Sequence, residues 1–297
     1  EGAIVELGPA AQLLVQPQHA HTRELVDAWR VRPASPPVRA DAPVLVAEGL
    51  AKDFAGSGRV VDDVSLTLHR GATLGVAGES GSGKTTLARL LMGIETPDAG
   101  TVRLGDMPWN PAREAARRPA RRRIQLVHQN PRAAFDPRWS IGRSIAEALG
   151  AGGVPRRDRA AAVARALEHV ELDAALAHRR PGQLSGGQRQ RAAIARALAA
   201  GPEMLILDEP VSALDASVQF TILALLERLQ RETGVAMLLI SHDLRVLAAV
   251  ADEVLVMRHG RVVEGGATAR VFAEPRHPFT RALLDAASLD ADAPGPG

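Results

Sequence analysis

Short apolar segments alternate with longer amphipathic segments along most of this chain. The apolar segments predict strands, and the main ones are Val44–Ala47, Val60–Leu68, Ala72–Ala77, Ile124–Val127, Met204–Leu207, Val235–Ile240 and Asp252–Met257. Apolar residues at helical spacing predict helices at Lys84–Met92, Arg189–Ala200 and Val218–Arg231. Because strands and helices alternate, we expect an α/β fold with a mainly parallel sheet and helices on both faces.

Two regions depart from this alternation. Residues 141–177 are rich in Ala, Arg and Leu at helical spacing, with an interruption at 150–155, and they predict a helical subdomain at about 139–199. Residues 32–43 are rich in proline and lack hydrophobic periodicity, which predicts a linker. The main globular domain is therefore expected to span residues 44–265, followed by a tail at 266–297.

The N-terminal residues repeat the C-terminal ones. Residues 1–29 align without gaps on residues 259–287, and both segments carry His-x-x-Thr-Arg-x-Leu near their ends. The identical pairs include Gly2/Gly260, Val5/Val263, Glu6/Glu264, Gly8/Gly266, Pro17/Pro275, His19/His277, Thr22/Thr280, Arg23/Arg281 and Leu25/Leu283. We therefore expect residues 1–31 to be the end of a preceding, homologous domain.

Composition narrows the class of protein. There is no cysteine, which excludes disulfides and thiolate metal sites in this chain. No apolar run approaches the roughly 18–20 residues of a membrane span, and the N-terminus does not resemble a secretory signal, which favours the cytoplasm. The net charge is only +2. Residues 113–123 carry six arginines without aromatic residues, so we expect a solvated face there and no nucleic-acid partner.

A glycine-rich loop joins a predicted strand to a predicted helix. Residues 78–85 fit the phosphate-loop pattern Gly-x-x-x-x-Gly-Lys-Thr, in which backbone N–H groups and the helix N-terminus bind phosphate. Lys84 is one of only two lysines, and its compact ammonium is expected to reach the β- and γ-phosphates of ATP. The Thr85 hydroxyl is expected to bind Mg²⁺. The nucleotide-binding residues expected here are Gly78, Glu79, Ser80, Gly81, Ser82, Gly83, Lys84, Thr85 and Thr86.

Polar residues follow two of the predicted buried strands. Asp208 and Glu209 end an apolar strand, where two carboxylates are costly unless a cation or a proton transfer uses them. Asp208 is expected to join the Mg²⁺ sphere through water, and Glu209 to act as the general base that polarises the attacking water. His242 follows the next buried strand, at the edge where open α/β sheets bind ligands, and a contact with the γ-phosphate is expected.

Residues 184–188 read Leu-Ser-Gly-Gly-Gln, with hydroxyl and glycines at the start of a predicted helix, which favours anion binding. Together with the preceding motifs they resemble the nucleotide-binding domain of an ATP-binding cassette (ABC) transporter, over about residues 44–284. The resemblance implies a P-loop NTPase (RecA-like) core, an antiparallel β subdomain and a helical subdomain that carries this signature. It also implies that Ser185, Gly186, Gly187 and Gln188 contact ATP held by an opposite domain.

The same resemblance implies roles for three further positions. Phe54 would stack on adenine, and Asp215, in Ser-Ala-Leu-Asp, would belong to the loop that communicates across a dimer of cassettes. Gln129 would be the lid glutamine that touches Mg²⁺ and senses the transmembrane subunit, with Gln125 as the less favoured candidate. His128 departs from the Phe that is usual before this glutamine, which leaves the local packing open.

The tail His277–Leu284 resembles the His-Pro-Tyr/Phe-Thr extension of ATPases that serve oligopeptide, dipeptide and nickel importers. This resemblance implies an ATP-hydrolysing importer subunit at the cytoplasmic face of the membrane, with ATP and Mg²⁺ as cofactors. Its partners would be two transmembrane permease subunits and, indirectly, an extracytoplasmic substrate-binding protein. A second ABC cassette, expected upstream in the same polypeptide, would complete the catalytic sites. Peptide uptake is the favoured hypothesis, and nickel or metal-chelate uptake is the alternative.

Two other hypotheses are less favoured. A non-transport ABC ATPase of the translation type would carry a long, charged helical linker, whereas residues 32–43 are short and proline-rich. Repair types need zinc-binding cysteines and chromosome types need long coiled coils, and this sequence contains neither. A degenerate nucleotide-binding regulator is disfavoured because Lys84, Asp208, Glu209 and His242 are all intact.

Overall fold

The computed structural model describes residues 4–9, 12–13, 16–20, 22–23, 43–56 and 58–292, with side chains described up to residue 287. The described residues do not include 24–42. This range holds the end of the predicted preceding domain, at 24–31, and all of the predicted linker at 32–43 except its last residue.

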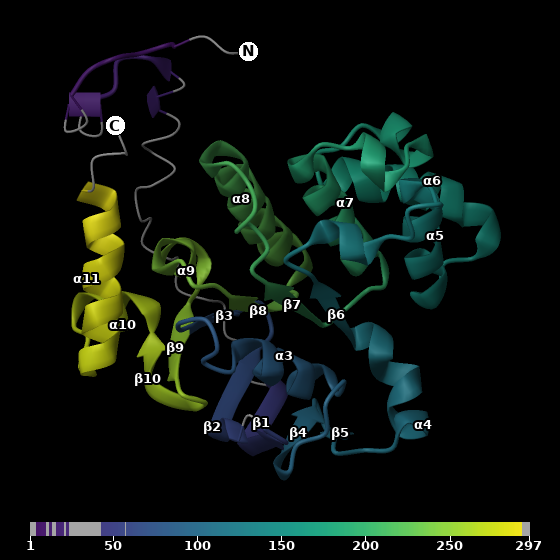
Figure 1. Cartoon of the computed structure of the whole chain (residues 1–297). Helices are drawn as coiled ribbons and strands as arrows, with labels where there is room; N and C mark the ends of the chain where they lie inside the picture. The colour runs from purple at the N-terminus through teal and green to yellow at the C-terminus, as the bar shows by residue number, and fades with distance from the viewer. Residues whose placement is uncertain are drawn as a thin grey trace.

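The core of the protein is a six-stranded sheet in the order β10-β9-β3-β8-β7-β6 (Figure 1). Its strands are β3 (Thr73–Ala77), β6 (Ile124–Val127), β7 (Met204–Asp208), β8 (Ala236–Ile240), β9 (Glu253–Arg258) and β10 (Arg261–Ala267). The strands from β9 to β6 run parallel, and β10 pairs antiparallel with β9. The predicted α/β fold with a mainly parallel sheet is confirmed, and the carboxyl ends of β3, β6, β7 and β8 meet at one edge.

A second sheet is antiparallel, in the order β2-β1-β4-β5. It comprises β1 (Pro43–Phe54), β2 (Gly58–His69), β4 (Ala99–Leu104) and β5 (Met107–Asn110). Helix α3 (Lys84–Met92) lies between the two sheets (Figure 1), and Leu87, Leu90 and Leu91 are fully buried in the core that joins them. Burial of each leucine stabilises this position by about 1.5–3 kcal/mol. The start of α3 is therefore fixed against the sheet edge.

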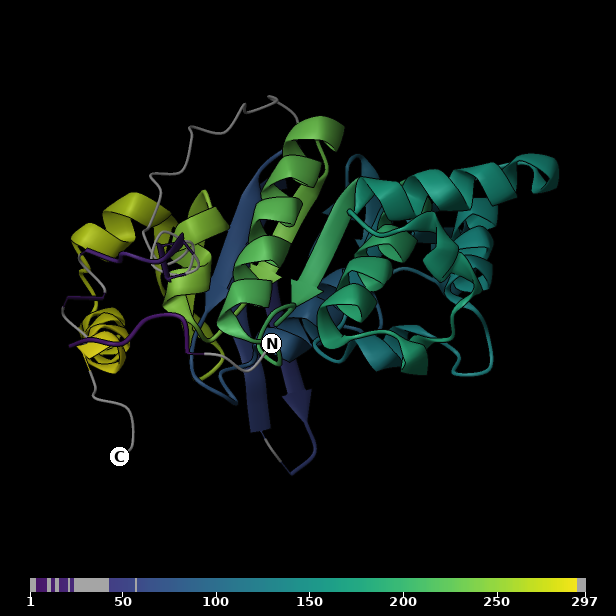
Figure 2. The same ribbon diagram turned by 90° about the horizontal axis from the view of Figure 1, so that it is seen from above.

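The opposite face of the parallel sheet is covered by α8 (Ala216–Thr233) and α9 (Leu244–Val250), as Figures 1 and 2 show. Alternate residues of β7 face opposite sides: Leu205 and Leu207 belong to this core, whereas Met204 and Ile206 pack on the α3 side. Burial on both faces explains why the parallel strands form continuous apolar runs in the sequence.

A helical subdomain lies to one side of the sheet (Figure 2). It contains α5 (Ile141–Ala151), α6 (Arg159–His169) and α7 (Gly186–Ala199), with short 3₁₀ turns at Arg156–Asp158, Ala174–His178 and Pro181–Gln183. The predicted interruption at 150–155 is the connection between α5 and the first of these turns. The remaining elements are α4 (Glu114–Arg117), 3₁₀ turns at Arg118–Arg123 and Pro131–Ala134, α10 (Thr268–Ala273) and α11 (Pro278–Asp292).

The arginine run at 113–123 is only partly the solvated face that we expected. The Arg117 guanidinium lies over the Trp109 ring, 5.8 Å from its centroid, and donates to the Gly93 carbonyl. Arg123 forms two hydrogen bonds of 2.7 Å with the Glu203 carboxylate. These two of the six arginines therefore make structural contacts beside α3 and β6, and the other four are exposed.

A half-buried carboxylate attaches the tail to strand β10. Glu264 accepts hydrogen bonds from the backbone N–H groups of Arg276 (2.8 Å) and His277 (3.0 Å). Burial opposes ionisation, but the Thr280 hydroxyl and these two N–H groups together keep the pKa of Glu264 below its ordinary value. We call this arrangement of Glu264, Arg276, His277 and Thr280 the glutamate clamp.

The N-terminal segment forms the same arrangement. Glu6 accepts hydrogen bonds from the backbone N–H groups of Gln18 (2.8 Å) and His19 (3.0 Å). A hydrogen bond with the Thr22 side chain, followed by these two bonds, lowers the pKa of Glu6. The repeat in the sequence therefore extends to the partners of the two glutamates, which stand at matching positions of the two segments.

The substitution Glu264→Gln is expected to loosen the tail at neutral pH. Because the folded-state pKa of Glu264 is lowered, its carboxylate stabilises the tail above the ordinary Glu pKa of about 4.3, and this contribution is lost as the pH falls. Hydrogen exchange at the N–H groups of Arg276 and His277 should therefore accelerate in the variant at pH 7, and in the wild type in acid. Glu274→Gln, at an exposed acid of the same tail, is the control, and equal exchange in all three proteins at pH 7 would contradict the clamp.

Candidate nucleotide-binding and catalytic site

The loop between β3 and α3 has a backbone that glycine makes possible. Gly78, Gly81 and Gly83 have φ angles of +150°, +80° and +102°. A side chain at Gly78 would collide with the Met257 carbonyl, and one at Gly83 with the Val60 carbonyl. No atom approaches the position of a side chain at Gly81, so the outer face of the loop is open. The loop therefore adopts a curved backbone that side chains at Gly78 and Gly83 would prevent.

Lys84 lies at the centre of this loop. It is 7% exposed, and its Nζ donates to the carbonyls of Gly78 and Glu79, at 2.7 Å each, and to the Ser82 hydroxyl at 3.3 Å. Burial lowers the pKa of Lys84, against the opposing influence of nearby carboxylates. No side chain caps the start of α3, and the Thr85 side chain is exposed. Free N–H groups, an ammonium and a hydroxyl therefore converge, as an anion requires.

Asp208 and Glu209 end strand β7 close to this loop. Burial raises the pKa of Asp208, and the negative charge of Glu209 adds to the effect. Glu209 has a φ of +48°, which L-residues rarely adopt, and its N–H donates to the Ile240 carbonyl at 2.9 Å. The strained backbone and the paired carboxylates are typical of functional sites.

The Glu209 carboxylate is held from two sides. One oxygen lies 2.8 Å from Nδ1 of His242, which follows β8, and the other accepts from Nε2 of Gln129, which follows β6, at 3.3 Å. Gln129 also donates to the Ser212 hydroxyl at 3.3 Å. Gln129, Glu209 and His242 follow three different strands and were predicted from separate motifs. In the structure they form one cluster, which we call the Glu209 cluster. Gln125 instead bonds backbone carbonyls near its own strand, so the geometry favours Gln129.

The signature residues lie at the start of α7, away from this cluster. The Ser185 hydroxyl accepts from the Gln188 N–H at 3.2 Å, and the Gln188 side chain accepts from the Ser185 N–H at 3.0 Å, which forms a capping box. The Ser185 O–H thus keeps its own proton for another acceptor. Among the described residues no hydrogen bond or ion pair joins positions 185–188 to positions 78–86.

Neighbouring side chains leave little room for a side chain at either signature glycine. A side chain at Gly187 would lie 2.6 Å from the Val218 side chain, and one at Gly186 would lie 3.2 Å from that of Leu214. The signature therefore packs against the loop that precedes α8 and against α8 itself. This close approach is a second reason for glycine at these positions, beside the binding of an anion.

Two other predicted positions are exposed to different degrees. Phe54 is half-buried at the end of β1, and Nζ of Lys52, the only other lysine, lies 5.5 Å from the centre of its ring. Asp215 is exposed at the start of α8 and makes no capping hydrogen bond with its side chain. The roles of both residues stay predictions.

Sequence motifs did not indicate a groove beside α3. Its volume is about 670 Å³, and the exposed residue Ile94 (61%) and His128 contribute to its lining. The other lining residues are Met92, Gly93, Trp109, Glu114, Arg117, Arg121, Ile124, Gln125, Leu126, Ala133, Ala134 and Arg196. They come from separate elements on both sides of the Gln129 segment, so no local pattern could have revealed the groove.

Comparison with known proteins places this fold and site in a family. Residues 61–212 match the ABC transporter family, and residues 263–292 match the family described as "Oligopeptide/dipeptide transporter, C-terminal region". A protein of Brucella abortus (strain 2308) named as a peptide import ATP-binding protein is 48% identical over 229 residues, which cover 76% of this chain and 69% of that protein.

A longer relative matches almost the whole chain. The peptidoglycan transport ATP-binding protein YejF of Agrobacterium fabrum is 42% identical over 302 residues, which cover 97% of this chain and 55% of that protein. The chain thus spans about half the length of this relative.

Solved structures agree with the fold. Clostridium perfringens cbiO1, part of the ABC transporter complex cbiONQ, has a TM-score of 0.71 at 27% identity, over 84% of this chain and 98% of that chain. A dimeric ATP-binding cassette bound to ADP and phosphate has a TM-score of 0.68 at 27% identity, over 75% of this chain and 98% of that one. A P-loop core with an inserted signature subdomain defines an ATP-binding cassette ATPase. The chain belongs to the ABC transporter family.

The substitution Lys84→Ala is expected to abolish ATP binding, because it removes the ammonium around which the loop is folded. Lys84→Arg should fail as well, since a planar guanidinium does not fit between the two carbonyls. Calorimetric titration with ATP measures both effects, and the melting temperature of each variant shows whether the fold is kept. ATP affinity unchanged in Lys84→Ala would refute the assignment of the loop.

Proposed function

We propose that this chain is the ATP-hydrolysing subunit of an importer that takes up peptides. The observation that carries the proposal is the Glu209 cluster, a carboxylate oriented from both sides at the sheet edge beside a phosphate loop. Relatives named for peptide import and for peptidoglycan transport, together with the oligopeptide/dipeptide tail, support peptides over nickel or a metal chelate as the cargo.

In the proposed reaction, Glu209 polarises the water that attacks the γ-phosphorus of ATP. Its position between His242 and Gln129 keeps the carboxylate in one orientation, so that it can accept the proton as the new P–O bond forms and the bond to ADP breaks. His242 is placed to contact the γ-phosphate, and Lys84 to neutralise charge on the β- and γ-phosphates. The Phe54 ring supports the adenine.

The residues beside the loop fit a bound Mg²⁺. Thr85 offers an exposed hydroxyl, Gln129 an amide oxygen and Asp208 a carboxylate. Burial raises the pKa of Asp208, and a bound cation would offset this cost by stabilising the negative charge. Among the described residues no group of three or more His, Cys, Asp and Glu could hold a metal alone. When bound, Mg²⁺ supplies positive charge to the leaving phosphates.

A second cassette is the proposed source of the missing half of each site. Ser185, Gly186, Gly187 and Gln188 would contact the nucleotide of that cassette, and Asp215 would lie at the junction of the two. The recurrence of the glutamate clamp at Glu6 supports a preceding homologous cassette that ends near residue 31, followed by the linker at 32–43. The extra length of YejF beyond the matched part agrees with this division.

The proposed membrane partners are two permease subunits. The groove that Ile94 and His128 line adjoins Gln129, so a permease segment seated there would lie one residue from the Glu209 cluster. None of the helices in the described part of the chain is both long and apolar enough to span a membrane. Because a relative is named as an ATP-binding protein of peptide import, we place the chain at the cytoplasmic face, where it would bind the permease peripherally and serve an extracytoplasmic binding protein indirectly.

The variant Glu209→Gln is expected to bind ATP with nearly unchanged affinity and to lose most phosphate release, by a factor of about 10²–10⁴. The amide keeps the shape of the side chain but cannot accept the proton, so the two-cassette form should persist with ATP bound. Phosphate release and size-exclusion chromatography with ATP measure these effects. Phosphate release at the wild-type rate would exclude Glu209 as the base.

A further inference from the structure

A strained glutamate ends helix α6 in the helical subdomain. Glu171 has a φ of +58°, and the hydrogen bonds Glu171 N–H to Glu168 O and Leu172 N–H to Leu167 O, both 2.9 Å, close the helix as a Schellman motif. Glycine is the usual residue at this position because it has no Cβ to strain the left-handed backbone. A glutamate here points to a use for its side chain.

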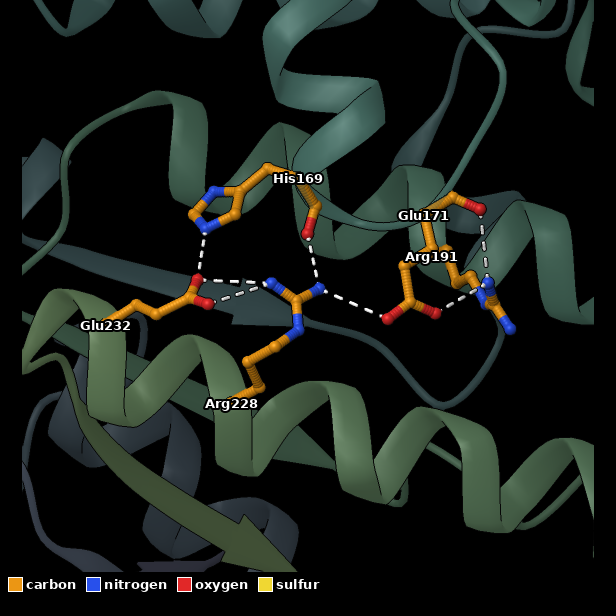
Figure 3. Close-up of polar contacts among 5 residues, drawn as sticks. All are labelled: His169, Glu171, Arg191, Arg228 and Glu232. Atoms are coloured by element: carbon orange, nitrogen blue, oxygen red, sulfur yellow. Dashed lines mark hydrogen bonds and ion pairs between the residues drawn. The ribbon is translucent and has the colours of Figure 1, made fainter.

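The Glu171 carboxylate joins two helices from different parts of the protein (Figure 3). One oxygen lies 3.3 Å from Nη2 of Arg228 on α8, and the other lies 3.3 Å from Nη1 of Arg191 on α7. The same Arg191 nitrogen donates to the Glu171 carbonyl at 3.2 Å. Arg191 lies in the signature helix, six residues after Ser185, whereas α8 belongs to the core that holds the Glu209 cluster.

Arg228 is itself fixed by further partners (Figure 3). Its Nη2 donates to the His169 carbonyl at 2.8 Å, and its Nη1 lies 3.1 Å from both oxygens of Glu232. The Glu232 carboxylate also lies 2.7 Å from Nε2 of His169. A single exposed ion pair contributes little, but a network of charges with several partners holds one geometry. The two arginine side chains are only 20% and 33% exposed.

We propose that Glu171 is a positioning residue that sets the angle of the signature helix α7 against core helix α8. Gly187, which faces Val218, lets the two helices approach near their starts, and Glu171 bridges them through Arg191 and Arg228. The bridge places the Ser185 hydroxyl where it reaches the nucleotide of the opposite cassette. This inference rests on the proposed function, because it assigns the signature to a second cassette.

The substitution Glu171→Gly tests the inference, because it relieves the left-handed backbone and removes the side chain that bridges the two helices. The variant should fold with an unchanged or higher melting temperature and bind ATP at Lys84 as the wild type does. Its kcat for hydrolysis in the two-cassette assembly should fall, on the order of tenfold, with KM for ATP little changed. Glu171→Gln, which keeps one oxygen as acceptor, should lie between the two. Glu168→Gln, at an exposed acid on the same helix end, is the control.

A distance measurement reports on this geometry through α6, which packs against α7 in the helical subdomain. The chain contains no cysteine, so cysteines placed at the exposed positions Arg165 on α6 and Arg231 on α8 can carry spin labels. The distance distribution should be narrow in the wild type and in Glu168→Gln, and broader or shifted in Glu171→Gly. An unchanged distribution together with unchanged kcat in Glu171→Gly would overturn the inference. Failure of the wild type to hydrolyse ATP would instead refute the proposed function and leave the distance test valid.

Discussion

The whole site depends on placing two half-buried carboxylates at the end of an apolar strand. Residues 204–207 of β7 are buried on both faces, and the chain then presents Asp208 and Glu209 at the sheet edge. Such a pair is stable only if cations and hydrogen-bond donors surround it. Lys84, His242 and Gln129 supply them from three neighbouring strand ends. The parallel order of the sheet is what brings these ends together.

The packing of α3 between the two sheets holds this edge in place. Leucines of α3 fill the space between the sheets, while the loop before it turns on glycines that touch the Val60 and Met257 carbonyls. Lys84 is therefore held within a frame that is fixed on both sides. The signature is held less directly: α7 meets the core through small-residue contacts and through the Glu171 bridge. Close packing thus fixes the phosphate loop. The orientation of the signature helix is instead set by polar contacts.

Much of this arrangement could be predicted from the sequence. Strands buried on both faces and helix Lys84–Met92 carry clear periodicity, and their predicted bounds differ from the observed ones by a few residues at most, except that β1 extends far beyond Val44–Ala47. Strands β4, β5 and β10 were not assigned, because they are short or half-exposed and contain glycine or proline. The seven-residue helix α9 was also too short for its periodicity to show.

The residues of the candidate site also fall into those that the sequence predicts and those that it does not. Motifs located the loop, the carboxylates and His242, because each lies in a contiguous pattern beside a strand. The Glu171 bridge and the groove near Ile94 are formed by residues that are distant in sequence and joined only by folding. The structural roles of Arg117 and Arg123 were missed for the same reason. Long-range polar contacts between elements leave no local pattern.

The central claim is that each catalytic site needs residues from two cassettes. The most direct test follows ATP turnover per chain as a function of chain concentration, with the fraction of monomer measured by analytical ultracentrifugation. The account predicts negligible turnover by the monomer, and turnover that appears when a second cassette, added or fused before residue 1, is present. Full turnover by a strict monomer would contradict it.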